Sequence, residues 1–161
     1  MSMMVIDPYR FAAAGDTFIM PYRQDVMAWS SVDGFGGMTY TRMQASTLLG
    51  GGVVLQASAA DADDGDYYEW YANLAAGTYT LTFLFWRDTD RAITTWSLDG
   101  VDIGTVDQYG SNAPNTAGTI SSITVAADGN YTLRCRANGK HASSTDYYLT
   151  IQSVTLHRTG A

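Results

Sequence analysis

An acidic cluster carries the most evident chemistry in the sequence. Four aspartates stand close together in the run DADDGD at 61–66, namely Asp61, Asp63, Asp64 and Asp66. Calcium is a hard cation that collects carboxylate oxygens from loops. The run departs from the EF-hand loop, because its third aspartate and its glycine come one residue early and no glutamate closes it. These residues predict a structural calcium site, and a solvated acidic turn before a strand explains them equally well.

Candidates for catalysis are few. Glutamate occurs once, at Glu69, and histidine occurs twice. His141, Ser143, Ser144 and Asp146 are close in sequence, but a catalytic triad draws its members from separate elements that a scaffold brings together. The sequence also lacks a nucleophile-turn motif of the G-x-S-x-G kind. We therefore expect no enzymatic activity.

The segment Gly77–Trp86, GTYTLTFLFW, predicts a strand around which the other elements are arranged. Its aromatic and leucine side chains fall mainly on one parity and its threonines on the other, as in a strand with one buried face. Gly77 suits the turn that begins this strand, because glycine adopts positive φ freely. The same reasoning, applied to the other strand-like runs, predicts a core that contains Trp70, Tyr79, Leu81, Phe83, Phe85, Trp96, Leu133 and Cys135.

Composition favours an all-β domain. The chain has 161 residues, enough for one domain with a sizeable core. It contains a single lysine and a single glutamate, which are common helix formers, while threonine, tyrosine, valine and glycine are plentiful. Asp99-Gly100 is a signal for a two-residue hairpin of the type I′ kind. In the last strand, the apolar residues before Gln152 and those after Ser153 fall on opposite parities. A bulge at Gln152-Ser153 would place both sets on the buried face.

Net charge and hydropathy exclude several classes of partner. The net charge of −7 leaves no basic face for sequence-independent binding to nucleic acid or to an anionic membrane. No apolar run approaches the roughly 18 residues that a membrane-spanning helix needs. The N-terminus lacks the basic start and continuous apolar stretch of a secretory signal peptide. Cys135 is the only cysteine, so an intrachain disulfide is excluded.

Strand-like and turn-like runs follow one another in a particular order along the chain. They are GDYYEW (65–70), LAAGTYTLTF (74–83), SLDGVDIG (97–104), ADGNYTLRC (127–135) and YYLTIQSVTLHR (147–158). This series, over about residues 36–158, resembles the carbohydrate-binding modules of families 6 and 35 in the galactose-binding-like superfamily. The resemblance implies an antiparallel β-sandwich of jelly-roll type. It also implies a structural calcium held by an aspartate of the last strand, where this chain has Gln152.

The resemblance places a glycan site in the loops at one end of the sandwich, with paired aromatic rings and an asparagine. Sugar rings stack their C–H patches on aromatic faces, while amide and guanidinium groups bind the hydroxyls. The loop 107–115 corresponds to the region that carries a tryptophan in the family, and Tyr109 takes its place here. The expected glycan-binding residues are Trp29, Trp86, Arg87, Tyr109, Asn112 and Asn115.

The first 25 residues predict an N-terminal docking arm ahead of a jelly-roll domain at 26–161. A Pro-Tyr-Arg tripeptide occurs twice in this arm. Tyrosine and arginine are favoured at interface hot spots, and proline stiffens the backbone that presents them. Chance repetition, and packing of the arm on its own sandwich, are the alternatives. The expected docking residues are Tyr9, Arg10, Tyr22 and Arg23.

Two functions stay open from the sequence. The preferred one is a non-catalytic accessory or structural protein of a bacteriophage virion, such as a capsid-decoration, head-fibre or tail component, with room for recognition of host-surface glycans. It rests on the run IDPYRF, which is similar to the openings of some virion proteins, and on the missing export signal. The expected partners are then further copies of the chain, assumed to form a trimer, and a virion assembled in the host cytoplasm. The alternative is a stand-alone carbohydrate-binding module that acts beside a polysaccharide-degrading enzyme.

Overall fold

The computed structural model describes residues 17–20, 41–45, 53–57 and 62–160. The elements are β1 (Thr17–Met20), β2 (Thr41–Ala45), β3 (Val53–Ala57), β4 (Tyr67–Leu74), β5 (Gly77–Arg87), β6 (Ala92–Leu98), β7 (Val101–Asp107), β8 (Ala113–Val125), β9 (Gly129–Lys140), β10 (Thr150–Ile151) and β11 (Ser153–Gly160). In this part of the chain there is no helix, and hence none long and apolar enough to cross a membrane.

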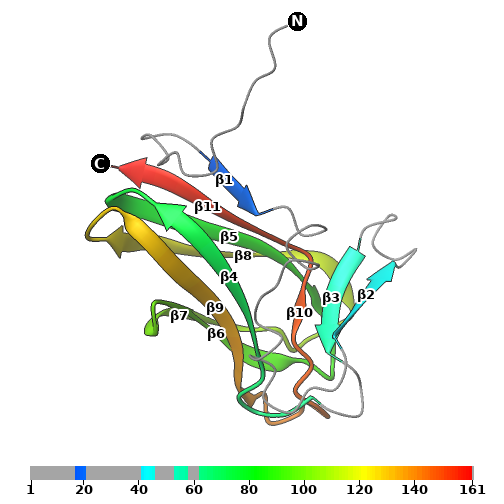
Figure 1. Cartoon of the computed structure of the whole chain (residues 1–161). Coiled ribbons are helices and arrows are strands. Elements are labelled where there is room, and N and C mark those ends of the chain that lie inside the picture. The colour runs from blue at the N-terminus through cyan, green and yellow to red at the C-terminus, as the bar shows by residue number, and fades with distance from the viewer. Residues whose placement is uncertain (1–16, 21–40, 46–52, 58–61, 161) are drawn as a thin grey trace, which may run out of the picture.

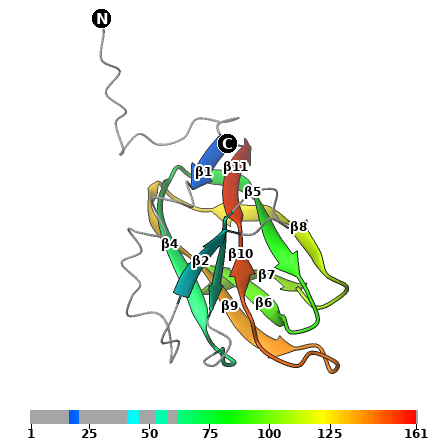
Figure 2. The ribbon, with the colours of Figure 1, turned by 90° about the vertical axis from the view of Figure 1, so that its right-hand side faces the viewer.

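Two four-stranded sheets face each other and form a sandwich (Figure 1). One sheet has the strand order β1-β11-β5-β8 and the other the order β4-β9-β6-β7. A three-stranded sheet, β10-β3-β2, lies beside them, and Figure 2 shows β10 leading directly into β11. All these strand pairs are antiparallel. The expected all-β antiparallel sandwich of jelly-roll type is therefore confirmed.

The residues that the parity rule selected lie in the core between the two large sheets. All eight predicted core residues are buried, from Trp70 on β4 to Cys135 on β9. Trp96 is at the centre, with its ring centroid 4.5 Å from that of Phe83 and 5.7 Å from that of Trp70. Gly118 of β8 lies against the Phe83 ring, which would be 2.3 Å from a Cβ atom at that position. The absence of a side chain there makes room for the ring.

The hairpin between β6 and β7 has the predicted geometry. Asp99 and Gly100 both have positive φ, 47° and 79°, as the two central residues of a type I′ turn require. The carboxylate of Asp99 accepts a hydrogen bond from the backbone N–H of Thr132 at 2.7 Å. This bond joins the turn to the neighbouring strand β9.

The last strand changes sheets at Gln152. Residues 150–151 form β10 and pair with β3, whereas residues 153–160 form β11 and pair with β5. Ile151 and Val154 are both buried, although an uninterrupted strand would point them to opposite faces. The predicted change of parity is confirmed, and it marks the passage from one sheet to the next.

Two strands differ from what we expected from the sequence. The sequence pattern predicts a strand at 119–126, but β8 begins at Ala113, because residues 113–118 pair with the end of β5 despite their polar and small side chains. β1 lies within the first 25 residues, where we expected a docking arm, and pairs with β11 through Thr17 and His157. The predicted docking residues Tyr9, Arg10, Tyr22 and Arg23 lie outside the described residues, so the docking role stays a prediction.

Candidate functional site

Three connections meet at one end of the sandwich, which we call the loop end. They are residues 88–91 after β5, together with the last two residues of that strand, residues 108–112 between β7 and β8, and residues 141–149 between β9 and β10. Backbone hydrogen bonds join them. The N–H of Asp88 donates to the carbonyl of Gln108 at 3.3 Å, and the N–H of Tyr148 donates to the carbonyl of Asp90 at 3.1 Å. The loop end is therefore one connected structure and not three independent loops.

The aromatic ring of Tyr109 is stacked on the imidazole of His141. Their centroids are 4.2 Å apart and their planes differ by 1°, and both side chains are half-buried. The Nδ1 atom of His141 accepts a hydrogen bond from the backbone N–H of Ser143 at 3.1 Å, which fixes the orientation of the ring. Tyr109 was predicted as a site residue and His141 was not, because the two are brought together only by the fold.

Arg87 and Asn112 flank this ring pair. The Nε atom of Arg87 donates to the carbonyl of Tyr109 at 3.0 Å. The amide of Asn112 donates to the carboxylate of Asp88 at 2.9 Å, and Asp88 forms a backbone bridge with Tyr109. Gly110 allows the close approach, because a Cβ atom there would lie 2.2 Å from Nε of Arg87. Three of the predicted glycan-binding residues are thus brought together.

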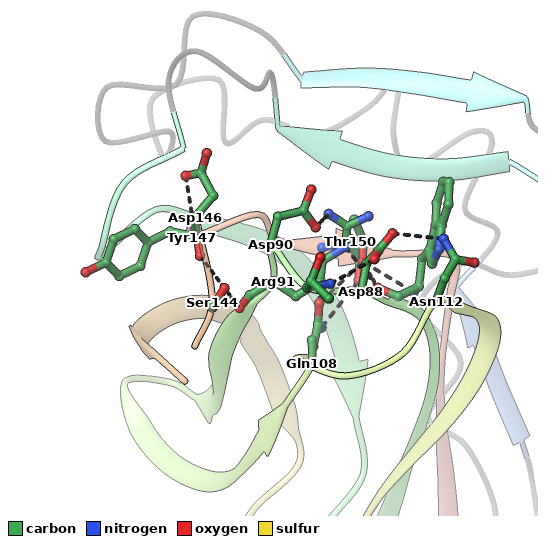
Figure 3. A network of polar contacts seen from close by, with 11 residues as sticks. Asp88, Asp90, Arg91, Gln108, Asn112, Ser144, Asp146, Tyr147 and Thr150 are labelled. Atoms are coloured by element: carbon green, nitrogen blue, oxygen red, sulfur yellow. Dashed lines mark hydrogen bonds and ion pairs between the residues drawn. The ribbon is translucent and has the colours of Figure 1, made fainter. Parts of the chain in front are cut away.

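A buried arginine, Arg91, stabilises the loop end through a hydrogen bond and an ion pair. Arg91 is only 2% exposed, and its Nε atom donates to the carbonyl of Trp86 at 3.0 Å. Its guanidinium forms an ion pair with Asp90 (Figure 3). The guanidinium carbon lies 5.4 Å from the ring centroid of Trp86 and 5.5 Å from that of Tyr148. Burial lowers the pKa of the Arg91 guanidinium and raises the pKa of the Asp90 carboxyl, and the ion pair opposes both shifts.

A second buried contact connects the loop 108–112 to β10. Gln108 is fully buried, its amide donates to the carbonyl of Thr150 at 3.4 Å, and its amide oxygen accepts from the N–H of Thr150 at 3.4 Å (Figure 3). The hydroxyl of Thr150 donates in turn to the carbonyl of Trp86 at 3.0 Å. One glutamine and one threonine therefore fix the ends of two strands and one loop.

The serine, histidine and aspartate of residues 141–146 do not form a catalytic triad. The Ser144 hydroxyl is buried and lies 2.9 Å from the carbonyls of both Arg91 and Asp146. The His141 Nδ1 atom accepts from the Ser143 backbone and not from a hydroxyl. These contacts stabilise the loop and leave the hydroxyl without a base to activate it.

Asn115 and Gln152 form a reciprocal amide pair. The backbone N–H of Asn115 donates to the amide oxygen of Gln152 at 2.9 Å, and the amide nitrogen of Gln152 donates to the side-chain oxygen of Asn115 at 2.8 Å. Asn115 is therefore bound to Gln152 and does not take part in the contacts that Arg87 and Asn112 make beside the ring pair. At Gln152, a calcium ion would find a neutral amide whose oxygen is already used, so this position does not fit the structural calcium that the resemblance implies.

Aspartates of the acidic cluster accept hydrogen bonds from backbone N–H groups. The buried carboxylate of Asp66 accepts from the backbone N–H of Asp63 at 2.8 Å, and that of Asp64 accepts from the N–H of Gly139 at 2.7 Å. Asp61 lies outside the described residues, as does Trp29 of the expected glycan site. Within the described ranges, no group of three or more histidine, cysteine, aspartate or glutamate side chains is arranged to hold a metal ion.

Comparison with known proteins shows the fold. No protein-family model matches the chain, and no curated protein sequence matches it. A Paenibacillus xanthan lyase structure matches with a TM-score of 0.64 and 21% identity over 80% of this chain, which spans only 13% of the lyase. The CBM36-1 domain of a multidomain xylanase from the hindgut metagenome of Trinervitermes trinervoides matches with a TM-score of 0.53 and 18% identity, over 80% of this chain and 94% of that domain.

The C-terminal family 6 carbohydrate-binding module of a marine laminarinase from Zobellia galactanivorans also matches. Its TM-score is 0.51 and its identity 12%, over 89% of this chain and all of that module (100%). At such identities the likeness concerns the fold alone. The chain therefore has the jelly roll of carbohydrate-binding modules, as the sequence resemblance implied, while these structures do not bear on the expected relation to bacteriophage proteins.

Proposed function

We propose that this protein is a non-catalytic glycan-binding module that acts beside a polysaccharide-degrading enzyme, and that its loop end binds the sugar. One observation carries the proposal: the Tyr109 ring is stacked in parallel on His141, next to Arg87 and Asn112. The shared fold with modules of a xylanase and a laminarinase supports it.

The ring pair supplies the apolar part of the site. The rings of Tyr109 and His141 are parallel and restrict each other's rotation. A ligand that stacks on the outer face of either ring therefore meets a side chain whose rotamer is already fixed. Fixing these side chains in advance lowers the entropy lost on binding. The C–H face of a pyranose ring is the natural partner of such a surface.

The polar part of the site comes from exposed side chains around the rings. Arg87 uses Nε for the carbonyl of Tyr109, and its two terminal nitrogens can then donate to ligand hydroxyls. Asn112 donates one amide hydrogen to Asp88, which leaves its other hydrogen and its oxygen for a ligand. Donors and acceptors in fixed positions beside an aromatic face suit a polyhydroxylated ring.

Removal of the Tyr109 ring tests the proposal. We expect Tyr109→Ala to lose at least tenfold in affinity for whichever polysaccharide the intact protein binds on a glycan array, a loss of about 1.4 kcal/mol or more. Tyr71→Ala is the matched control, since Tyr71 is a 60% exposed tyrosine on β4, outside the loop end. If Tyr109→Ala binds as tightly as the intact protein, the sugar does not bind at this ring.

The virion role preferred from the sequence is not part of this proposal. It rests on the N-terminal segment, most of which lies outside the described residues, so the role stays a prediction. Neighbouring genes discriminate the two functions, because capsid and tail genes favour a virion component and genes for polysaccharide-degrading enzymes favour a binding module.

A further inference from the structure

β8 is an edge strand with unusual properties. Among the strands that the structure describes it has one neighbour, β5, and it forms the end of its sheet (Figures 1 and 2). It is 13 residues long. An edge of this length presents a row of backbone N–H and C=O groups that can pair with another strand.

This edge also lacks the charges that usually protect one. The segment Ala113–Val125 contains no aspartate, glutamate, lysine or arginine, in a chain whose net charge is −7. Natural edge strands are commonly blunted by charged side chains, proline or bulges. β8 has Pro114 and a bulge near each end, but no charge, and between the bulges it has neither proline nor charge. One of the two edge strands of the opposite sheet, β7, carries such charges at Asp102 and Asp107.

Two bulges divide β8 and leave a regular segment between them. Asn115 and Ser122 have positive φ, 57° and 60°, at the two places where the register with β5 shifts. From Thr116 to Ile120 the pairing with β5 is continuous. The side chains of this segment are small on its exposed face, where Ala117 and Thr119 lie. Small side chains at these positions leave room beside the backbone groups with which a second strand would pair.

We propose that a second copy of this chain pairs with β8 along Thr116–Ile120, antiparallel and about a two-fold axis, so that the two β5-containing sheets become one. Two copies with a charge of −7 repel each other over most of their surface, and β8 carries none of that charge. A highly charged partner would find no complementary charge on this strand. An identical uncharged strand matches it.

Strand parity is consistent with self-pairing. A two-fold axis at Gly118 or at Thr119 places residues of equal parity opposite each other. Gly118 and Ile120 then stay on the inner face of both copies, while Ala117 and Thr119 stay on the outer face. No register slip is needed, and no buried side chain is turned towards solvent.

A charge on the edge tests the proposal, with a charge on the neighbouring strand as control. In Thr119→Asp, two carboxylates would lie about 5 Å apart if the axis is at residue 119, or about 8 Å apart on the diagonal if it is at residue 118. Thr82 is exposed and directly opposite Thr119 in the register of β5 with β8, one strand away from the edge. Thr82→Asp therefore adds the same charge to the same sheet face.

Sedimentation velocity of the full-length protein over a range of concentrations gives the readout. We expect the intact protein and Thr82→Asp to form dimers and Thr119→Asp to associate at least tenfold more weakly. Higher salt should strengthen the association of the intact protein, because screening weakens the repulsion between two anionic copies. Ala117→Lys is a second edge variant, in case Thr119→Asp is shown by circular dichroism to be unfolded.

Three results would overturn the proposal. The intact protein could sediment as a single chain at every concentration. A folded edge variant, Thr119→Asp or Ala117→Lys, could dimerise as well as the intact protein. Thr82→Asp could dissociate the dimer as strongly as Thr119→Asp, which would move the contact from the strand edge to the sheet face.

Discussion

The core between the two large sheets and the loop end both contain fully buried side chains, but different forces hold them. In the core, Trp96 contacts Phe83 and Trp70 through their rings, and the stabilisation comes from apolar area removed from water. At the loop end, Arg91 and Gln108 are buried and each is bound through hydrogen bonds to specific backbone carbonyls. Apolar packing depends little on the orientation of the groups in contact, whereas hydrogen bonds depend strongly on it.

This difference determines how each region responds to substitution. A core side chain that is shortened leaves a cavity, and the cost follows the volume lost. A polar partner removed from the loop end leaves a buried donor or acceptor without its bond, and the cost follows the desolvation of that group. The core should therefore be sensitive to size and the loop end to hydrogen-bond chemistry.

The largest effect is expected in the core. Phe83→Ala should lower the free energy of unfolding by about 3–5 kcal/mol, because it empties the space between Trp96 and Gly118. Urea denaturation measures this loss, with Thr82→Ala as the exposed neighbour that should change little. A loss under about 1 kcal/mol for Phe83→Ala would mean that the centre of the core is elsewhere.

Arg91 tests whether a buried charge is as important as a buried ring. Arg91→Met keeps much of the volume but leaves Asp90 without its ion pair, and we expect a loss of about 2–4 kcal/mol, reduced because Asp90 is 32% exposed. Arg91→Lys keeps the charge and loses the hydrogen bond from Nε to Trp86, so its stability should lie between that of the intact protein and that of Arg91→Met. Arg91→Met with unchanged stability in chemical denaturation would show that packing alone suffices at the loop end.

Gln108 separates hydrogen bonding from volume. Gln108→Ala should cost about 1–3 kcal/mol, because the backbone groups of Thr150 would lose their side-chain partner. Gln108→Leu restores the volume without the amide, and we expect its melting temperature to be no higher than that of Gln108→Ala. A leucine variant that recovers the full stability would instead make this position behave like the core.

Asn112 should give the smallest change in stability. Its hydrogen bond to Asp88 is exposed, so Asn112→Ala should lower the unfolding free energy by no more than about 0.5 kcal/mol. Glycan affinity should nevertheless fall several-fold, as measured by titration calorimetry. The control is Asn130→Ala, which removes an equally exposed amide bond, to Asn73, outside the loop end. Equal affinities of the two variants would exclude Asn112 from the site.

Much of the fold could be predicted from the sequence because its determinants are local. The alternation in β5 selects the buried parity, Asp99-Gly100 specifies a turn that only positive φ allows, and the parity change near Gln152 reports the change of sheet. The early start of β8 could not be predicted in this way. Its first residues are polar or small, and they become a strand only because β5 offers them partners.

The candidate site could be predicted only in part. Arg87, Tyr109 and Asn112 were expected because the family resemblance places a glycan site in the loops at one end of the sandwich, and these residues lie at or near strand ends there. His141, Arg91 and Gln108 were not, because each has a partner far away in the chain that its own sequence neighbourhood does not reveal. The His141 ring is stacked on Tyr109, the Arg91 guanidinium lies beside the ring of Tyr148, and Gln108 contacts Thr150 across 42 positions. The sequence pattern near each of these residues contains no sign of the distant partner.

The position of β11 has a consequence for synthesis on the ribosome. β11 lies in the interior of its sheet, between β1 and β5, although it is the last strand along the described chain. While the chain is being translated, β1 has no partner in this sheet and β5 can pair only with β8. The apolar faces of the half-made sandwich stay open until residues 153–160 emerge. Folding is then a late, long-range event, and an incomplete chain exposes apolar strand faces of the kind that promote aggregation.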